Sequence, residues 1–203
     1  TIAQLREQGY KGFYVAIGCQ GGRLPGIAGE NLPGVTTAVD FLKEANTGAR
    51  QISGKVVVVG GGNVAIDAAR VAKRSGAADV TMLSLEDEDT MPASLEEKTE
   101  AREDGVVIRP GWGPKEILGE TGVTGVAFKK CVSVFDEQGR FAPRYDESEL
   151  LTLEADLVIF AIGQTVVLDD LLKGTKVELH RGLYPVADPL TYQTAEADIF
   201  TGG

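Results

Sequence analysis

The stretch that decides the fold is KVVVVGGGNVAIDAAR, residues 55–70. Four consecutive valines predict a strand that is buried on both faces, as in a parallel sheet. The glycines that follow permit a tight turn, which a Cβ atom would block. An alanine-rich run then has the composition of a helix. Residues 55–70 therefore predict a strand, a turn and a helix in direct succession.

The turn carries the pattern G-x-G-x-x-A at Gly60, Gly62 and Ala65. In a dinucleotide site the first glycine makes the turn, the second lets the backbone approach a pyrophosphate, and the alanine lets the helix pack closely on the strand. The free N–H groups of Asn63 and Val64, together with the helix dipole, then face the anion. The pattern predicts that this turn binds a dinucleotide.

Two other interpretations of the turn stay open at this point. It could be an ordinary tight turn between strand and helix with no ligand. It could also be the glycine loop of a methyltransferase, whose adenosyl donor has no pyrophosphate. Gly61 occupies the variable position of the pattern, so we expect binding to depend on it less strictly than on Gly62.

The composition is that of an ordinary globular protein. Of the 203 residues 43% are hydrophobic and 25% are charged, which argues against disorder. The net charge of −10 argues against a nucleic-acid or anionic membrane partner. No apolar run approaches the roughly 20 residues of a membrane span, and the first residues do not resemble a signal peptide. We expect a cytoplasmic protein.

Metal-ligating and nucleophilic side chains are scarce. Cys19 and Cys131 form neither a C-x-x-C pair nor part of a metal cluster, and unpaired cysteines suit a reducing compartment. His180 is the only histidine, which excludes a multi-histidine metal site and argues against a histidine-based triad. We therefore predict no catalytic side chain and no metal site in this chain.

The periodicity of hydrophobic residues and the positions of Gly and Pro along the chain predict an alternation of helices and strands. Since a strand, a helix and a second strand follow within about thirty residues, we expect a right-handed crossover and a parallel pair. A β-rich stretch at 123–153 predicts an antiparallel meander, and residues 20–34 a long loop. The expected helices are 2–8, 63–75, 94–104 and one that Thr36 or Thr37 caps and that ends at about residue 46. The expected strands are 13–18, 55–59, 80–83, 106–108 and 157–163.

An acidic run follows the second strand of this unit. In dinucleotide sites an acid about 20 residues beyond the glycine turn accepts hydrogen bonds from the adenosine ribose. Glu86 lies 21 positions beyond Ala65 and is the first candidate, with Asp87 and Glu88 as alternatives and a solvated loop as the non-functional interpretation. A carboxylate here would repel a 2′-phosphate, so the run predicts NADH over NADPH, although Arg109 could approach through the fold.

Two further motifs accompany the glycine turn. Residues 14–18 and 159–163 both end in Ala-Ile-Gly, and residues 91–94 read Met-Pro-Ala-Ser. Together with the glycine run, over nearly the whole chain, they resemble the pyridine-nucleotide-dependent flavoproteins of the glutamate synthase small (β) subunit type.

The resemblance implies an α/β fold of the three-layer FAD/NAD(P)-binding, Rossmann-like type, with a parallel sheet, helices on one side and a β-meander on the other. In this family an NAD(P)-binding domain is inserted into an FAD-binding domain. We expect residues 34–187 to form the NAD(P)-binding domain. Residues 1–33 and 188–203 would be flanking segments of the FAD domain, the second one truncated. Strands ending in Ala161, Ile162 and Gly163 pass between the two domains in such proteins.

The resemblance also implies a function. A nicotinamide nucleotide would pass hydride to FAD, and the electrons would go on to iron–sulfur centres or a partner subunit. The glycine loop for FAD and the iron–sulfur segment would belong to the full-length protein and not to this fragment, which would be inactive alone. The alternative is a nucleotide-sensing module without redox chemistry.

One departure from the family concerns cofactor choice. Relatives that use NADPH carry two arginines that hold the 2′-phosphate, and the matching positions here are Leu85 and Glu86. The expected cofactor-binding residues are Gly60, Gly61, Gly62, Asn63, Val64, Ala65, Leu85, Glu86, Ala161, Ile162 and Gly163.

Overall fold

The structure is a computed structural model that describes residues 1–48 and 51–203. The chain divides into two compact units. The larger unit is Gly22–Gly163, and the smaller one combines Thr1–Gly21 with Gln164–Gly203. The boundaries expected from the sequence, after residues 33 and 187, refer to the domains of a parent protein and stay a prediction.

The larger unit is built on a five-stranded parallel sheet with the strand order β3-β10-β4-β5-β6. The two central neighbours β4 and β10 are buried at nearly every position, which explains their unbroken apolar sequences. All strand pairs in this sheet are parallel. The strands are β3 (Val35–Thr37), β10 (Leu157–Phe160), β4 (Lys55–Val59), β5 (Asp79–Ser84) and β6 (Val107–Pro110).

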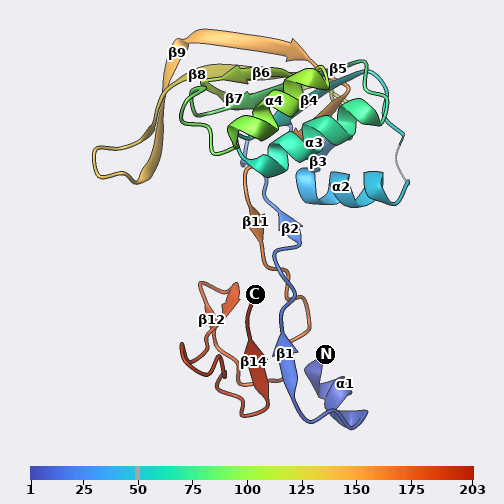
Figure 1. Cartoon of the computed structure of the whole chain (residues 1–203), viewed down its shortest axis with the longest axis vertical. Helices are drawn as coiled ribbons and strands as arrows, with labels where there is room; N and C mark the ends of the chain where they lie inside the picture. Colours follow the sequence, from blue (N-terminus) through green and yellow to red (C-terminus); the bar gives the residue numbers. More distant parts are fainter. Residues whose placement is uncertain (49–50) are drawn as a thin grey trace. The chain divides into compact units, whose positions relative to one another are not determined.

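Three helices cover one face of this sheet: α2 (Ala38–Asn46), α3 (Asn63–Arg74) and α4 (Leu95–Glu103) (Figure 1). Since successive side chains of a strand point to opposite faces, the valines of β4 serve two cores. Val56 and Val58 pack with the helices. Val57 and Val59 belong to the core on the other face.

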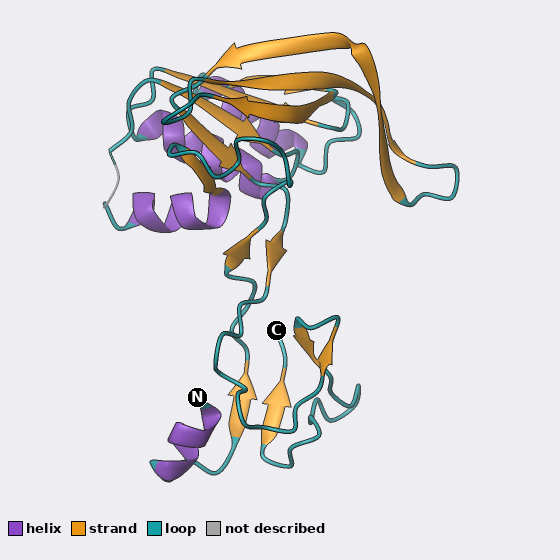
Figure 2. Cartoon of the chain, turned by 180° about the vertical axis from the view of Figure 1, so that it is seen from behind, coloured by secondary structure: helices purple, strands orange, loops and turns teal. Residues whose placement is uncertain are grey.

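An antiparallel meander covers that other face (Figure 2). It consists of β7 (Trp112–Leu118), β8 (Gly125–Phe135) and β9 (Phe141–Glu154). Phe128 of β8 is fully buried in the core between the meander and the sheet. The expected fold, a parallel sheet between helices and a β-meander, is therefore confirmed.

The smaller unit holds the first helix and a parallel strand pair. Helix α1 (Ile2–Glu7) precedes β1 (Phe13–Val15), which pairs with β14 (Ile199–Thr201). The guanidinium of Arg6 binds both carboxylate oxygens of Asp198, at 2.8 and 2.6 Å. A short antiparallel pair in this unit joins β12 (Leu179–His180) to β13 (Tyr184–Pro185). The remaining short strands of the chain are β2 (Gly21–Gly22) and β11 (Gln164–Thr165).

The structure differs from the sequence expectations in several elements. Strand β7 was not predicted, because Gly113 and Pro114 interrupt its apolar pattern. The strand forms through pairing with β8, and a register shift between Pro114 and Glu116 accommodates the proline. Strand β3 and the short β2 also lie outside the predicted strands. The strands predicted at 13–18 and 157–163 end earlier, at Val15 and Phe160.

Candidate functional site

The predicted residues gather at the carboxyl ends of the parallel strands. In open α/β sheets this edge is where ligands bind. Strand β4 ends at Val59, and its neighbours end in register with it, since Val59 is aligned with Phe160 of β10 and with Leu83 of β5. The glycine turn, the segment after β10 and the acidic run after β5 therefore meet at one edge.

Gly60 makes the closest approach between these segments. Its φ is +153°, and a Cβ atom at this position would lie 2.5 Å from the carbonyl oxygen of Ala161. The Gly60 N–H donates to the Leu83 carbonyl at 2.8 Å, and the Ala161 N–H donates to the Val59 carbonyl at 2.8 Å. The chain after β10 thus lies directly against the glycine turn, which only a residue without a side chain permits.

Gly62 faces open space. It is the N-cap of α3 in an extended conformation, with φ −96° and ψ 175°, and no side chain caps this helix. No heavy atom lies within 4 Å of the position of an added Cβ. Since the first N–H groups of a helix have no partner inside it, those of Asn63 and Val64 are available to an anion in this space. Ala65 is fully buried, as close helix packing requires.

A second segment braces the glycine turn. The Ala93 N–H donates to the Gly61 carbonyl at 3.0 Å, and the Ser94 N–H donates to the Asn63 side-chain oxygen at 3.1 Å. Met91 and Ala93 are buried in the helix-side core. The Met-Pro-Ala-Ser motif therefore fixes the turn, and the Asn63 side chain has a structural role that the sequence analysis did not anticipate.

The three acidic candidates have different environments. One carboxylate oxygen of Asp87 accepts the N–H groups of Asp89 and Thr90 and the Thr90 hydroxyl. These bonds lower the pKa of Asp87, led by that of the hydroxyl. Glu88 forms an ion pair with Arg102 at 2.6 Å. Among the described residues, only Glu86 of these three has a carboxylate with no hydrogen-bond partner.

The Glu86 carboxylate lies over the glycine turn. A Cβ atom on Gly61 would be 2.6 Å from its Oε2 atom. The Glu86 carbonyl accepts the Ser84 hydroxyl at 2.9 Å and the Gly111 N–H at 2.8 Å, which fixes the backbone of this residue. Gly61 thus lies next to the Glu86 carboxylate, and how strictly binding depends on Gly61 stays a prediction.

Leu85 points elsewhere. A Cβ atom on Gly113 of β7 would lie 2.9 Å from Leu85 Cδ2 and 2.4 Å from the ring of Tyr145. The Leu85 side chain thus packs against the meander, so the structure brings Glu86 to the glycine turn but not the side chain of Leu85.

Two cations border the same end of the site. Arg109 is exposed on β6 and aligned with Leu83 of β5. The Lys130 ammonium lies 5.0 Å from the centroid of the Trp112 ring. Burial, above all, raises the pKa of the neighbouring Cys131 thiol, and the Glu86 charge raises it further. Both signs of charge are therefore present where an adenosine ribose would lie.

The segment after β10 completes the edge. Ile162 is partly exposed, and Gly163 has a φ of +127°. The Gly163 carbonyl accepts the Arg23 N–H at 3.2 Å, and the Arg23 side chain runs past the glycine. Sequence reasoning missed Arg23, which lies in a segment interpreted only as a loop.

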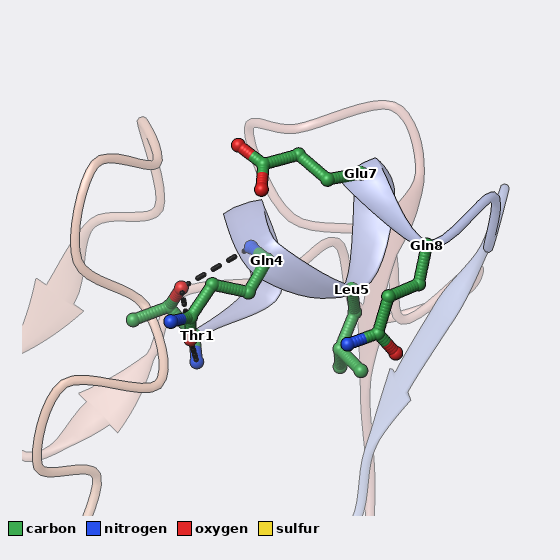
Figure 3. A pocket seen from close by; sticks show the side chains of 5 residues that line it. All are labelled: Thr1, Gln4, Leu5, Glu7 and Gln8. Atoms are coloured by element: carbon green, nitrogen blue, oxygen red, sulfur yellow. Dashed lines mark hydrogen bonds between the residues drawn. The ribbon is translucent and has the colours of Figure 1, made fainter.

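Other features of the described residues offer less evidence of a binding site. A shallow pocket in the smaller unit is lined by residues of α1, but the Thr1 hydroxyl is engaged in capping this helix (Figure 3). No group of three or more His, Cys, Asp and Glu side chains in the described ranges could hold a metal ion. Within residues 1–48 and 51–203, no helix is both long and apolar enough to cross a membrane.

The sheet, its two covering layers and the glycine turn define the class: a three-layer α/β domain of the FAD/NAD(P)-binding type. The chain belongs to the pyridine nucleotide-disulphide oxidoreductase family, whose model matches residues 3–203.

Named relatives agree with this assignment. The chain is 33% identical to the glutamate synthase [NADPH] small chain of Halomonas elongata, over 98% of this chain and 45% of the relative. It is 34% identical to the NADP(+)-dependent formate dehydrogenase subunit beta of Moorella thermoacetica, over 100% of this chain and 29% of the relative. It thus spans less than half of either protein.

Solved structures share the fold. FprA of Mycobacterium tuberculosis in complex with NADPH matches with a TM-score of 0.75 at 19% identity, over 100% of this chain and 60% of that one. Thioredoxin reductase of T. acidophilum matches with a TM-score of 0.69 at 20% identity, over 95% of this chain and 57% of that one.

Proposed function

We propose that this chain is the nicotinamide-dinucleotide-binding part of a flavoprotein oxidoreductase that passes hydride from NADH to FAD. The observation that carries the proposal is the uncapped start of α3, with open space at Gly62 and with the carboxylate of Glu86 over the preceding residue, Gly61. A bound pyrophosphate requires free N–H groups at the start of a helix, and an adenosine ribose requires a carboxylate that accepts hydrogen bonds from its hydroxyls.

Most of the predicted residues have a role in this proposal. The N–H groups of Asn63 and Val64 bind the pyrophosphate, and Glu86 accepts hydrogen bonds from the ribose hydroxyls. Residues 161–163 line the nicotinamide end. Gly60 and Ala65 hold the turn and the helix close to the strands. Hydride transfer to a flavin needs no general acid or base from this chain, so the protein contributes binding and orientation.

The rest of the system lies outside this chain in the proposal. FAD and iron–sulfur centres belong to the remainder of the parent protein or to a partner subunit, and the protein works in the cytoplasm. Relatives are named as a small chain and as a subunit beta, which supports a multi-part enzyme. Purification of the full-length parent tests this: bound flavin that NADH reduces is expected, and a flavin-free parent would favour the nucleotide-sensing module.

We further propose that the chain prefers NADH. A carboxylate at Glu86 repels the 2′-phosphate of NADPH while it accepts hydrogen bonds from the free ribose of NADH. Two of the relatives cited above have NADPH or NADP in their names, whereas an Escherichia coli O157:H7 relative at 32% identity is named an NAD-dependent dihydropyrimidine dehydrogenase subunit.

Calorimetric titration of the chain with both nucleotides tests the preference. The unmodified chain is expected to bind NADH more tightly, and Leu85→Arg/Glu86→Arg is expected to shift the ratio towards NADPH. Glu86→Arg alone is expected to shift the ratio in the same direction, and Asp89→Arg is its matched control, because it changes the charge equally at an exposed position of the same loop. Tighter NADPH binding by the unmodified chain would contradict the preference.

A further inference from the structure

Lys130 lies near Gly111, the residue whose backbone is bonded to that of Glu86. The Gly111 N–H donates to the Glu86 carbonyl at 2.8 Å. The Lys130 Nζ atom lies 3.0 Å from the position that a Cβ atom on Gly111 would occupy, and it sits over the Trp112 ring. An ammonium from β8 therefore lies beside the residue that follows β6, at the carboxyl edge of the sheet where the nucleotide is expected, although β8 lies in the meander and far from β5 in sequence.

The charge of this lysine is not neutralised within the described residues. Lys130 is half-buried, yet its ammonium has no hydrogen bond and no ion pair there. Lys129, the preceding residue, binds Glu147 at 3.0 Å. Asp146 is aligned with Lys130 across the strands, but its carboxylate accepts the N–H and the hydroxyl of Ser148 instead.

An ammonium without an ion pair is unusual in a chain of net charge −10, because carboxylates are plentiful. Stacking on an indole ring stabilises the cation in part. The arrangement leaves the three N–H donors of the ammonium free for an anionic group, and a phosphate is the anion that a lysine point charge binds well.

We propose that the Lys130 ammonium interacts with the group at the 2′ position of the nucleotide. It would supply, from the meander, the cation that the acidic run after β5 does not provide. The inference rests on the proposed function and refines it. Glu86 disfavours a 2′-phosphate and Lys130 attracts it, so the chain binds NADPH as a second, weaker ligand. The affinity ratio between NADH and NADPH then depends on the charge at position 130.

The test is Lys130→Gln, titrated with NADH and NADPH, which differ only in the 2′-phosphate. NADPH binding is expected to weaken about fivefold to tenfold, and NADH binding to change less than about twofold. Lys130→Arg keeps the charge and is expected to retain NADPH binding. Lys130→Met removes the charge but keeps a long unbranched side chain, and it is expected to behave like the glutamine variant.

Lys129→Gln is the matched control, because it removes the same charge from the next residue of the same strand, where the ammonium is already paired. It is expected to leave both affinities nearly unchanged. Equal weakening of both nucleotides by Lys130→Gln, an unchanged NADPH affinity, or no NADPH binding by the unmodified chain would overturn the inference. Absence of NADH binding by the unmodified chain would instead overturn the proposed function on which it rests.

Discussion

A side chain at position 62 would enter the open space in front of α3. The backbone there is extended, a conformation that valine adopts readily. Gly62→Val is therefore expected to change the free energy of unfolding by less than about 1 kcal/mol, while NADH binding weakens at least about tenfold because the side chain occupies the pyrophosphate position. Calorimetry and thermal denaturation measure the two effects.

The control for this substitution is Gly12→Val. Gly12 also has open space around its Cβ position, but it lies in the smaller unit and outside the predicted site. It should leave NADH affinity unchanged. An unaltered affinity in the Gly62 variant would mean that the dinucleotide does not approach the turn.

At the scale of elements, the start of α4 and the glycine turn hold each other in place through Asn63. Asn63→Ala removes the acceptor of the Ser94 N–H, and a lost hydrogen bond of this kind costs about 1 kcal/mol. Amide exchange at Ser94 is expected to accelerate. Asn63→Asp keeps the acceptor but adds a negative charge beside the anion, so it should preserve slow exchange and weaken NADH binding. Unchanged Ser94 protection in the alanine variant would show that the brace is unimportant.

Ion pairs join α3 to α4 at Asp104. Its carboxylate accepts Arg70 Nε at 2.8 Å and also binds Arg74, and the hydrogen bond from Arg70 is the main reason why the pKa of Asp104 is lowered. A lowered folded-state pKa means that the stabilisation is fully present above the unfolded pKa of about 3.9 and is lost as pH falls through the folded value.

Asp104→Asn removes this contribution. Its destabilisation relative to the unmodified chain, measured by urea denaturation, is expected to be large near neutral pH and to shrink below about pH 4. The same difference at both pH values would mean that the ion pairs do not stabilise the fold.

At the scale of the whole molecule, every predicted cofactor-binding residue lies in the larger unit, as do both of its cores. A shortened chain of residues 22–163 is therefore expected to fold and to bind NADH within about threefold of the affinity of the 203-residue chain. Circular dichroism and calorimetry test this. A folded but non-binding shortened chain would show that residues 1–21 or 164–203 contribute to the site.

The sequence by itself determined the centre of the fold. Strand β4, the glycine turn and α3 follow one another without interruption. Their hydrophobic periodicity and the glycines that separate them are local properties of residues 55–74. For the same reason the helix start at Ser94 could be predicted, and the start at Thr37 could be narrowed to Thr36 or Thr37, since each N-cap accepts the N–H of a residue three positions further on.

Only the tertiary structure decided which side chains meet at the site. Spacing could not separate Glu86 from Asp87 and Glu88, because the difference lies in hydrogen bonds made after folding. Strand β7 depends on pairing with β8, and the position of Lys130 beside Gly111 depends on that pairing in turn. Contacts between residues far apart in the sequence leave no periodic signal, so they become visible only once the layers are packed together.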